Sequence, residues 1–170
     1  NVLVGLKKPA SALEIGTSIG YSGSLILHAM NPEGRLVTVE SNEDVQKLAR
    51  ENFSKQGLSN RVNLILGDGK DVLNHLDDTF DLIFLDGPKA QYLNYLSDCI
   101  RLLNKGGLLV CDDVLFYGMV AKDELVKKKK ITIVRRMRKF LQTLVEYPDL
   151  DTTIVPIGEG ISLSVKRTSE

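Results

Sequence analysis

Short apolar runs alternate with helical patterns along almost the whole length of this 170-residue chain. The runs are uniformly apolar, which is typical of short strands in a parallel sheet that helices cover on both faces. Repeated βα units with right-handed crossovers leave few topologies open. The pattern therefore predicts an α/β fold with a doubly wound sheet.

The seven expected strands comprise five that alternate with helices and two that form a closing hairpin. We expect strands at 12–15, 35–39, 62–66, 80–85, 108–111, 151–156 and 160–165. The expected helices are 20–30, 43–56, 70–76, 91–103 and 131–147. A Gly-rich turn indicates the hairpin, which implies an antiparallel strand at one end of the sheet. The prediction is a Rossmann-like sheet, mostly parallel with an antiparallel C-terminal hairpin strand.

Length and composition indicate one domain, spanning 1–170. The apolar fraction of 43% is ordinary for a soluble globular protein. No apolar stretch approaches the roughly 20 residues that span a membrane, and we expect no signal peptide. The two cysteines, Cys99 and Cys111, lack metal-type spacing, so a reduced, cytoplasmic protein is the natural interpretation, with Cys111 buried. Because Asn1 lies only about ten residues before the first strand, we expect that an N-terminal segment is missing.

A glycine turn follows the first expected strand, in the sequence LEIGTSIGYSG at 13–23. The second strand ends in an acid, Glu40, which can accept both hydroxyls of a ribose. Together they predict a site for a nucleoside-bearing cofactor. The turn from Gly16 to Gly20 lacks the second glycine of G-x-G-x-x-G, which disfavours a dinucleotide and favours a cofactor without phosphates, such as S-adenosylmethionine (SAM). The next loop, 67–69, is where the adenine would lie.

Three carboxylates follow the fourth and fifth strands, namely Asp86, Asp112 and Asp113. Neighbouring strands of a parallel sheet end at the same edge, so these side chains are expected to converge. Unpaired carboxylates repel one another, and a hard cation such as Mg²⁺ relieves the repulsion. Lys89 lies three residues beyond Asp86, within reach of a substrate hydroxyl whose proton it could accept beside a metal. The alternative is that one acid only caps a helix and that Lys89 is a solvated surface residue.

With these motifs in place, the chain resembles the cation-dependent class I methyltransferases of the catechol and caffeoyl-CoA O-methyltransferase type. It most resembles their bacterial relatives, including the tRNA 5-hydroxyuridine methyltransferases. The resemblance covers 12–166 and rests on EIGTSIGYS at 14–22, Glu40, Asp86-x-x-Lys89-x-x-Tyr92 and Asp112-Asp113. Each motif is weak alone, and together they are specific.

The resemblance implies a role for each matching residue. Lys89 would be the general base, and Glu40 would hold the ribose. The remaining cofactor contacts would come from Glu14, Gly16, Ser18, Tyr21 and Ser22 at the methionine end, from Asp68 and Gly69 at the adenine, and from Asp86. Mg²⁺ or another divalent ion would bind Asp86, Asp112 and Asp113. The reaction would be direct displacement of the methyl group onto a hydroxyl that shares the metal with a neighbouring oxygen.

Two departures from the family pattern bear on these roles. The family often carries Asn at the position of Asp113, so the extra charge here could tighten metal binding or change the preferred metal. The family also carries an N-terminal helical segment that covers the active site and helps to build a homodimer. Most of that segment has no counterpart in this sequence.

Two acceptors remain open, a catechol-like phenol and 5-hydroxyuridine of tRNA, whose O4 and O5 can chelate a metal as a catechol does. The sequence between Val120 and Phe140 contains nine Lys or Arg residues and only two acidic residues. The basic region 127–139 could contact tRNA phosphates, although aromatic residues for stacking are few. It is mostly the resemblance to the bacterial relatives that favours the tRNA. The basic region could instead be a solvated surface or a dimer contact.

Outside this class, two hypotheses compete with the methyltransferase. A nicotinamide-dependent oxidoreductase shares the fold type, but the glycine pattern and the three carboxylates argue against it. A non-catalytic cofactor-binding protein would need the glycines and Glu40, yet it would need neither Lys89 nor three acids.

Overall fold

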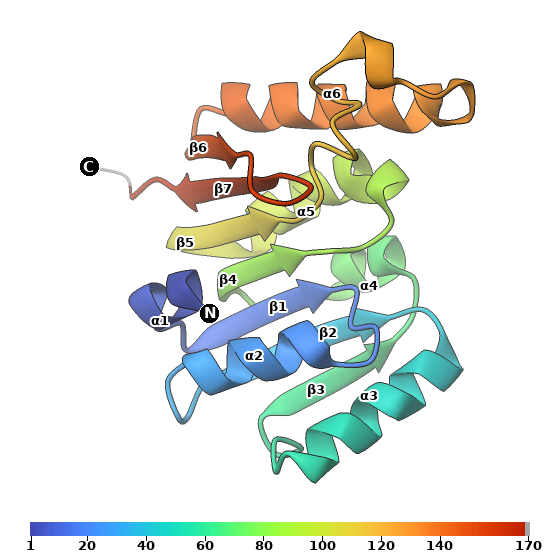
Figure 1. Cartoon of the computed structure of the whole chain (residues 1–170). Helices are drawn as coiled ribbons and strands as arrows, with labels where there is room; N and C mark the ends of the chain where they lie inside the picture. The colour runs from blue at the N-terminus through green and yellow to red at the C-terminus, as the bar shows by residue number, and fades with distance from the viewer. Residues whose placement is uncertain (169–170) are drawn as a thin grey trace.

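The computed structural model describes residues 1–168, and its strands and helices alternate in the predicted order (Figure 1). The strands are β1 (Ser11–Ile15), β2 (Arg35–Glu40), β3 (Val62–Leu66), β4 (Phe80–Leu85), β5 (Leu103–Cys111), β6 (Leu150–Val155) and β7 (Ile161–Lys166). The α-helices are α1 (Val2–Lys7), α2 (Tyr21–Ala29), α3 (Glu43–Lys55), α4 (Gly69–His75), α5 (Tyr92–Leu102) and α6 (Ile131–Glu146). Short 3₁₀ turns η1 (Lys89–Gln91), η2 (Asp123–Leu125) and η3 (Lys128–Lys130) lie between them.

The seven strands form one sheet in the order β3-β2-β1-β4-β5-β7-β6. Strands β1 to β5 are parallel, and β7 alone runs against its neighbours. The seven-stranded, mostly parallel fold is thus confirmed. The sequence placed the reversed strand at the end of the sheet, whereas β7 lies second from the edge and β6 forms the edge. Strand β7 pairs with both β5 and β6, which a hairpin pattern alone does not specify.

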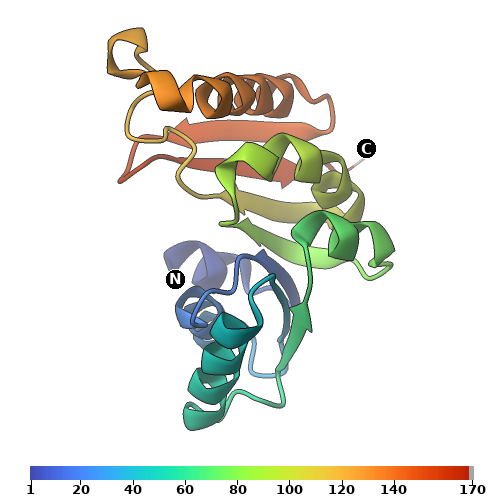
Figure 2. The same ribbon diagram turned by 90° about the vertical axis from the view of Figure 1, so that its right-hand side faces the viewer.

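Strand residues alternate between two cores, one on each face of the sheet. On β1, β4 and β5 the side chains of Leu13, Ile83 and Leu109 pack under α4, α5 and α6. Their neighbours Ala12 and Leu82 pack under α1, α2 and α3. Figure 2 shows α2 and α3 on one side of the twisted sheet and α4 on the other. Helices cover both faces of the central strands β1 and β4, which is why these strands read as continuous apolar runs, whereas β6 at the sheet edge and its neighbour β7 keep exposed and polar residues.

Local details of the fold follow from single residue types. Asn42 caps α3, because its side chain accepts hydrogen bonds from the backbone N–H groups of Asp44 and Val45. Cys99 and Cys111 are both buried free thiols. Within residues 1–168, no helix has the length and apolar character needed to cross a bilayer.

Candidate cofactor and catalytic site

The sheet reverses its winding order between β1 and β4, which lie side by side although β2 and β3 separate them in sequence. The crevice at such a switch point, beyond the carboxyl ends of the strands, is where ligands bind in open α/β sheets. Gly16 follows β1 with φ of 105°, and a Cβ there would lie 2.4 Å from the carbonyl oxygen of Asp86. Only glycine fits, because the turn packs directly against the end of β4.

Glu40 is fixed by two backbone donors at the end of β2. The N–H of Ser18 donates to Oε2 at 2.9 Å, and the N–H of Asn42 donates to Oε1 at 2.9 Å. An ionised carboxylate has about four acceptor positions, so two remain for the hydroxyls of a ribose. Ser18 adopts a left-handed φ of 48° in this tight turn. The glycine turn and the acid of the next strand thus form one unit, as their order in the sequence predicted.

A cavity of about 410 Å³ opens at this crevice, within the range of about 300–1,000 Å³ that small-molecule sites occupy. Of the residues assigned to the cofactor from the sequence, it is lined by Gly16, Ser18, Glu40, Asp68, Gly69 and Asp86. Ser41, Pro88 and Tyr95 also line it. Sequence reasoning missed these three, since no motif marks them and α5 places Tyr95 there only through packing.

The other three predicted cofactor residues lie away from that cavity. Tyr21 is 71% exposed at the start of α2. Ser22 borders a second, apolar cavity of about 280 Å³ between α1, α2 and the sheet. Glu14 is fully buried behind the glycine turn, where its carboxylate accepts from Ser22 Oγ and, at 2.6 Å, from Thr38 Oγ1. The contacts of these three residues with the cofactor stay predictions. In the structure, the hydrogen bonds of Glu14 hold Ser22 and β2 in place.

Burial raises the pKa of Glu14 to about 7, against the lowering effect of its hydrogen bonds to Ser22 and Thr38. The folded state therefore keeps this proton after the unfolded chain has lost it, and stability falls as the pH rises from about 4.5 to about 7. The difference corresponds to about 3 kcal/mol. We expect Glu14→Gln, which keeps an acceptor oxygen but does not titrate, to gain this amount relative to the native chain over the same interval.

Urea unfolding at several pH values between 4.5 and 8 measures this gain. Glu51→Gln, at an exposed position on α3, is the matched control and should follow the native curve. Parallel curves for Glu14→Gln and the native chain would show that Glu14 is ionised throughout and that the buried carboxyl is not destabilising.

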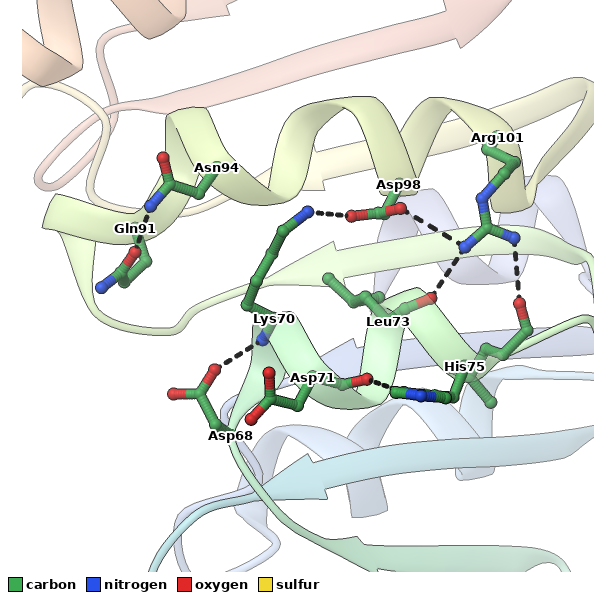
Figure 3. A network of polar contacts seen from close by, with 10 residues as sticks. Asp68, Lys70, Asp71, Leu73, His75, Gln91, Asn94, Asp98 and Arg101 are labelled. Carbon is green, nitrogen blue, oxygen red and sulfur yellow. Dashed lines mark hydrogen bonds and ion pairs between the residues drawn. The ribbon is translucent and has the colours of Figure 1, made fainter.

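The loop after β3 is held from the side of α5. Asp68 caps α4, because its Oδ1 accepts from the N–H of Lys70 at 2.8 Å. Lys70 reaches across to Asp98 on α5, and Arg101 joins Asp98 at 3.4 Å to the carbonyl oxygen of Leu73 at 2.8 Å (Figure 3). Asp98 is only 8% exposed, so these charges are partly desolvated and lock α4 to α5. The predicted adenine loop, 67–69, therefore has a rigid support.

Lys89 lies between two of the three predicted metal ligands. Its Nζ is 2.8 Å from Asp86 Oδ1 and 3.1 Å from Asp113 Oδ2, and its side chain is 14% exposed. Asp112 is adjacent, with its Oδ1 accepting from the N–H of Asp113 at 2.7 Å. The structure thus brings Lys89 and the two strand ends together, as the sequence predicted. A solvated surface lysine does not describe this position.

The hydroxyl group of Tyr92 contacts Lys89 and the ends of both β4 and β5. It lies 3.0 Å from the carbonyl oxygens of both Leu85 and Asp112, so it ties the end of β4 to the end of β5. Lys89 Nζ donates to the same hydroxyl at 3.1 Å. Burial raises the pKa of Tyr92, which keeps it a proton donor to the carbonyl groups. The ring of Tyr92 packs edge-on against Phe140, and its hydroxyl also fixes Lys89.

The three carboxylates do not form a ready-made metal centre. Among residues 1–168, no group of three or more His, Cys, Asp or Glu side chains is arranged to hold a metal ion, so the expected convergence of three acids is not seen in this arrangement. The donor set nevertheless suits a divalent cation, because Asp86 and Asp113 share the single ammonium group of Lys89 and Asp112 adds a third carboxylate next to Asp113. Burial raises the pKa of Asp112, and the charges of Asp113 and Asp86 raise it further. This crowding of negative charge is what a cation would relieve.

The basic region 127–139 divides into bound and free side chains. Arg138 pairs with Asp123 at 2.7 Å and donates to the carbonyl oxygens of Met119 and Val120, and Arg136 donates to Asn94. Lys130 stacks over the ring of Phe116. The exposed cations whose side chains take no part in an ion pair or hydrogen bond within 1–168 are Lys127, Lys128, Lys129, Arg135 and Lys139. Residues 127–139 contain eight Lys or Arg, so fewer cations are available to a polyanion than the sequence count of this region indicates.

A family described as O-methyltransferase has a model that matches residues 1–167 of the chain. A curated relative, a putative caffeoyl-CoA O-methyltransferase from Arabidopsis thaliana, is 27% identical over 173 residues. The match covers 96% of this chain and 72% of that protein.

Solved structures of similar proteins share the whole fold. A putative caffeoyl-CoA O-methyltransferase from Staphylococcus aureus superposes with a TM-score of 0.89 at 28% identity, covering 97% of this chain and 79% of that one. The O-methyltransferase TomG from Streptomyces achromogenes, in complex with SAM, gives 0.88 at 27% identity, covering 98% and 77%.

Proposed function

This chain belongs to the O-methyltransferase family and is a SAM-dependent enzyme, and on that premise we propose that it methylates a hydroxyl group that has a neighbouring oxygen, with the help of a divalent cation. The observation that carries the proposal is the position of Lys89. Its ammonium group is held by Asp86 and Asp113, and Asp86 also lines the cofactor cavity. Asp86 therefore contacts both the proposed proton acceptor, Lys89, and the cofactor site.

In the proposed mechanism, the cofactor binds on one side of Asp86 and the methyl acceptor on the other. On the cofactor side, Glu40 holds the ribose, and the Gly16 turn lets the backbone approach the ligand closely. On the acceptor side, Lys89 in its neutral amine form takes the proton of the acceptor hydroxyl. The hydroxyl oxygen then attacks the methyl carbon of SAM as the carbon–sulfur bond breaks, and S-adenosylhomocysteine leaves with the electron pair on its sulfur. Tyr92 and the two carboxylates fix Lys89, so much of the rate comes from positioning.

Asp86, Asp112 and Asp113 are the residues that would hold the cation. When bound there, a divalent ion supplies Lewis acidity that makes the acceptor hydroxyl easier to deprotonate. The chain's own contribution is to keep three carboxylates at adjoining strand ends. Lys89 offsets part of their repulsion.

For the acceptor, we propose 5-hydroxyuridine in tRNA. The free cations at 127–129 precede α6, and Arg135 and Lys139 lie on it. This part of the chain contacts the segment that follows Asp113 through Lys130, over Phe116, and through Arg138, which bonds to Met119 and Val120. Figure 1 shows this amber segment at the upper right, on the side to which the arrowheads of β1 and β4 point. Lysines at the start of α6 face the positive end of the helix dipole, which disfavours them for helix stability. A phosphate backbone would be attracted by both charges, which supports a role in tRNA binding.

Methyl transfer from radiolabelled SAM tests both parts of the proposal. We would offer tRNA with 5-hydroxyuridine, the same tRNA with uridine at that position, and a catechol, each with Mg²⁺ and with a chelator. Label that requires Mg²⁺ and enters only the first tRNA is the expected result. Label on the catechol alone would favour the small-molecule alternative, and label on none, with SAM still bound, would contradict the proposed acceptors.

The free lysines can be tested in the same assay. Replacing Lys127, Lys128 and Lys129 by Gln should raise the KM for tRNA and weaken its dependence on salt, by about one unit of slope for each phosphate that the variant no longer neutralises. Exposed lysines on α3, Lys47 and Lys55, provide the matched control. An unchanged salt slope in the triple variant would remove this surface from the proposal. The predicted cytoplasmic location and homodimer stay predictions.

A further inference from the structure

The segment that follows Asp112 is held in a backbone conformation that side chains rarely adopt. Within residues 1–168, five non-glycine residues have positive φ, and three of them are Asp113 at 56°, Phe116 at 45° and Tyr117 at 57°. Such conformations persist only where the surroundings impose them, and they concentrate at functional sites. Contacts with other parts of the fold must therefore hold the loop 113–117 in this conformation.

The support comes from the turn between β6 and β7, more than forty positions later in the sequence. The N–H of Val114 donates to the carbonyl oxygen of Gly160 at 2.9 Å, and that of Leu115 to the carbonyl oxygen of Glu159 at 2.8 Å. The carboxylate of Glu159 then accepts from the N–H of Tyr117. Glu159 thus binds the loop through both its backbone and its side chain.

The turn itself is shaped for close approach. Gly160 has φ of 83°, and a Cβ there would lie 2.3 Å from Cγ of Leu115. The backbone bonds place the turn against 114–115, and only the Glu159 carboxylate reaches onward to Tyr117, whose ring is 70% exposed. The far end of the loop is fixed separately, by Arg138 bonding to Met119 and Val120.

We propose that Glu159 is a positioning residue for the acceptor side of the site, which fixes Asp113, the half-buried Phe116 and the exposed Tyr117 in their working arrangement. This inference rests on the proposed function of the Asp112–Asp113 side. Glu159 does not line the cofactor cavity, so its loss should affect the acceptor and the cation while SAM binding stays the same.

Glu159→Ala and Glu159→Gln separate positioning from general stability. Glutamine keeps an oxygen that can accept from Tyr117, whereas alanine removes it. We expect Glu159→Ala to lower kcat/KM for the acceptor about tenfold and to raise the Mg²⁺ concentration for half-activation, with SAM affinity unchanged and Glu159→Gln close to native. Glu124→Ala, an exposed acid in η2, is the matched control.

A second readout does not depend on turnover. The chain contains no tryptophan, so Tyr117→Trp places a single reporter on the loop. In this background, Glu159→Ala should increase quenching of the reporter by acrylamide, and Glu159→Gln should restore it. If quenching changes as expected while no acceptor is methylated, the proposed acceptor is wrong and the support by Glu159 remains. Unchanged quenching and kinetics in Glu159→Ala, or an equal loss of SAM affinity, would overturn the inference.

Discussion

Replacing Lys89 by Met is expected to lower kcat by about 10²–10⁴-fold, the range that general acid–base catalysis contributes. Lys89 is the proton acceptor in the proposed mechanism, and it is held by Asp86, Asp113 and Tyr92. The side chains of Asp86 and Asp113 are 37% and 41% exposed, so water screens their repulsion and the variant should still fold. SAM affinity, measured by calorimetry, should remain close to native because Lys89 does not line the cofactor cavity.

Lys89→Arg is the decisive companion variant. Arginine keeps the positive charge between Asp86 and Asp113, but it does not give up its proton in proteins. We therefore expect Lys89→Arg to be as inactive as Lys89→Met, with Lys47→Met on the exposed face of α3 as the control. Activity in the arginine variant would show that Lys89 acts through its charge alone. Loss of SAM binding in Lys89→Met would show that its assigned role is wrong.

Asp112→Asn is expected to lower activation by Mg²⁺ most strongly among single changes at the strand ends. The amide keeps an oxygen to accept from the N–H of Asp113, so the local backbone should be preserved. The variant lacks one negative charge of the three that would hold the cation. Lewis-acid assistance is worth several kcal/mol, so kcat at ordinary Mg²⁺ should fall by about 10²–10³-fold.

A Mg²⁺ titration of the methylation rate measures this effect. The half-activating concentration should rise in Asp112→Asn, and part of the rate should return at high Mg²⁺. Asp44→Asn, on the 92% exposed side chain at the start of α3, controls for the removal of a carboxylate elsewhere. A native response to Mg²⁺ in Asp112→Asn would remove Asp112 from the cation site. Full activity of the native chain with a chelator would remove the cation from the mechanism.

Much of the fold was predictable because its signals are local. Uniform apolar runs identified the strands, and glycines and caps identified where they end. The same signals located Gly16, Glu40 and Asp86, since parallel strands deliver the residues after them to one edge of the sheet. The long fifth strand was predicted only in part. Strand β5 begins at Leu103, with a register irregularity opposite Phe80 and Leu82, and the Gly-rich 105–107 hid that extension.

The individual roles within the site were less predictable. Glu14 belongs to the cofactor motif in the sequence, but its side chain points to the core under α2, where Ser22 and Thr38 satisfy it. The spacing of Tyr92 from Lys89 does not reveal that its hydroxyl joins β4 to β5. The period of a strand or helix gives the face of each residue, whereas its hydrogen-bond partner depends on which elements meet there.

The sequence alone therefore determined the α/β class, the cofactor edge and the residue types that gather there, because these depend on periodicity and turn chemistry over a few residues. Only the tertiary structure decided that β7 enters between β5 and β6, that Lys89 lies between Asp86 and Asp113, and that Arg136 and Arg138 serve the fold. Such contacts join segments far apart in the chain. They are set by strand register and by the packing of helices on the sheet, which no local pattern encodes.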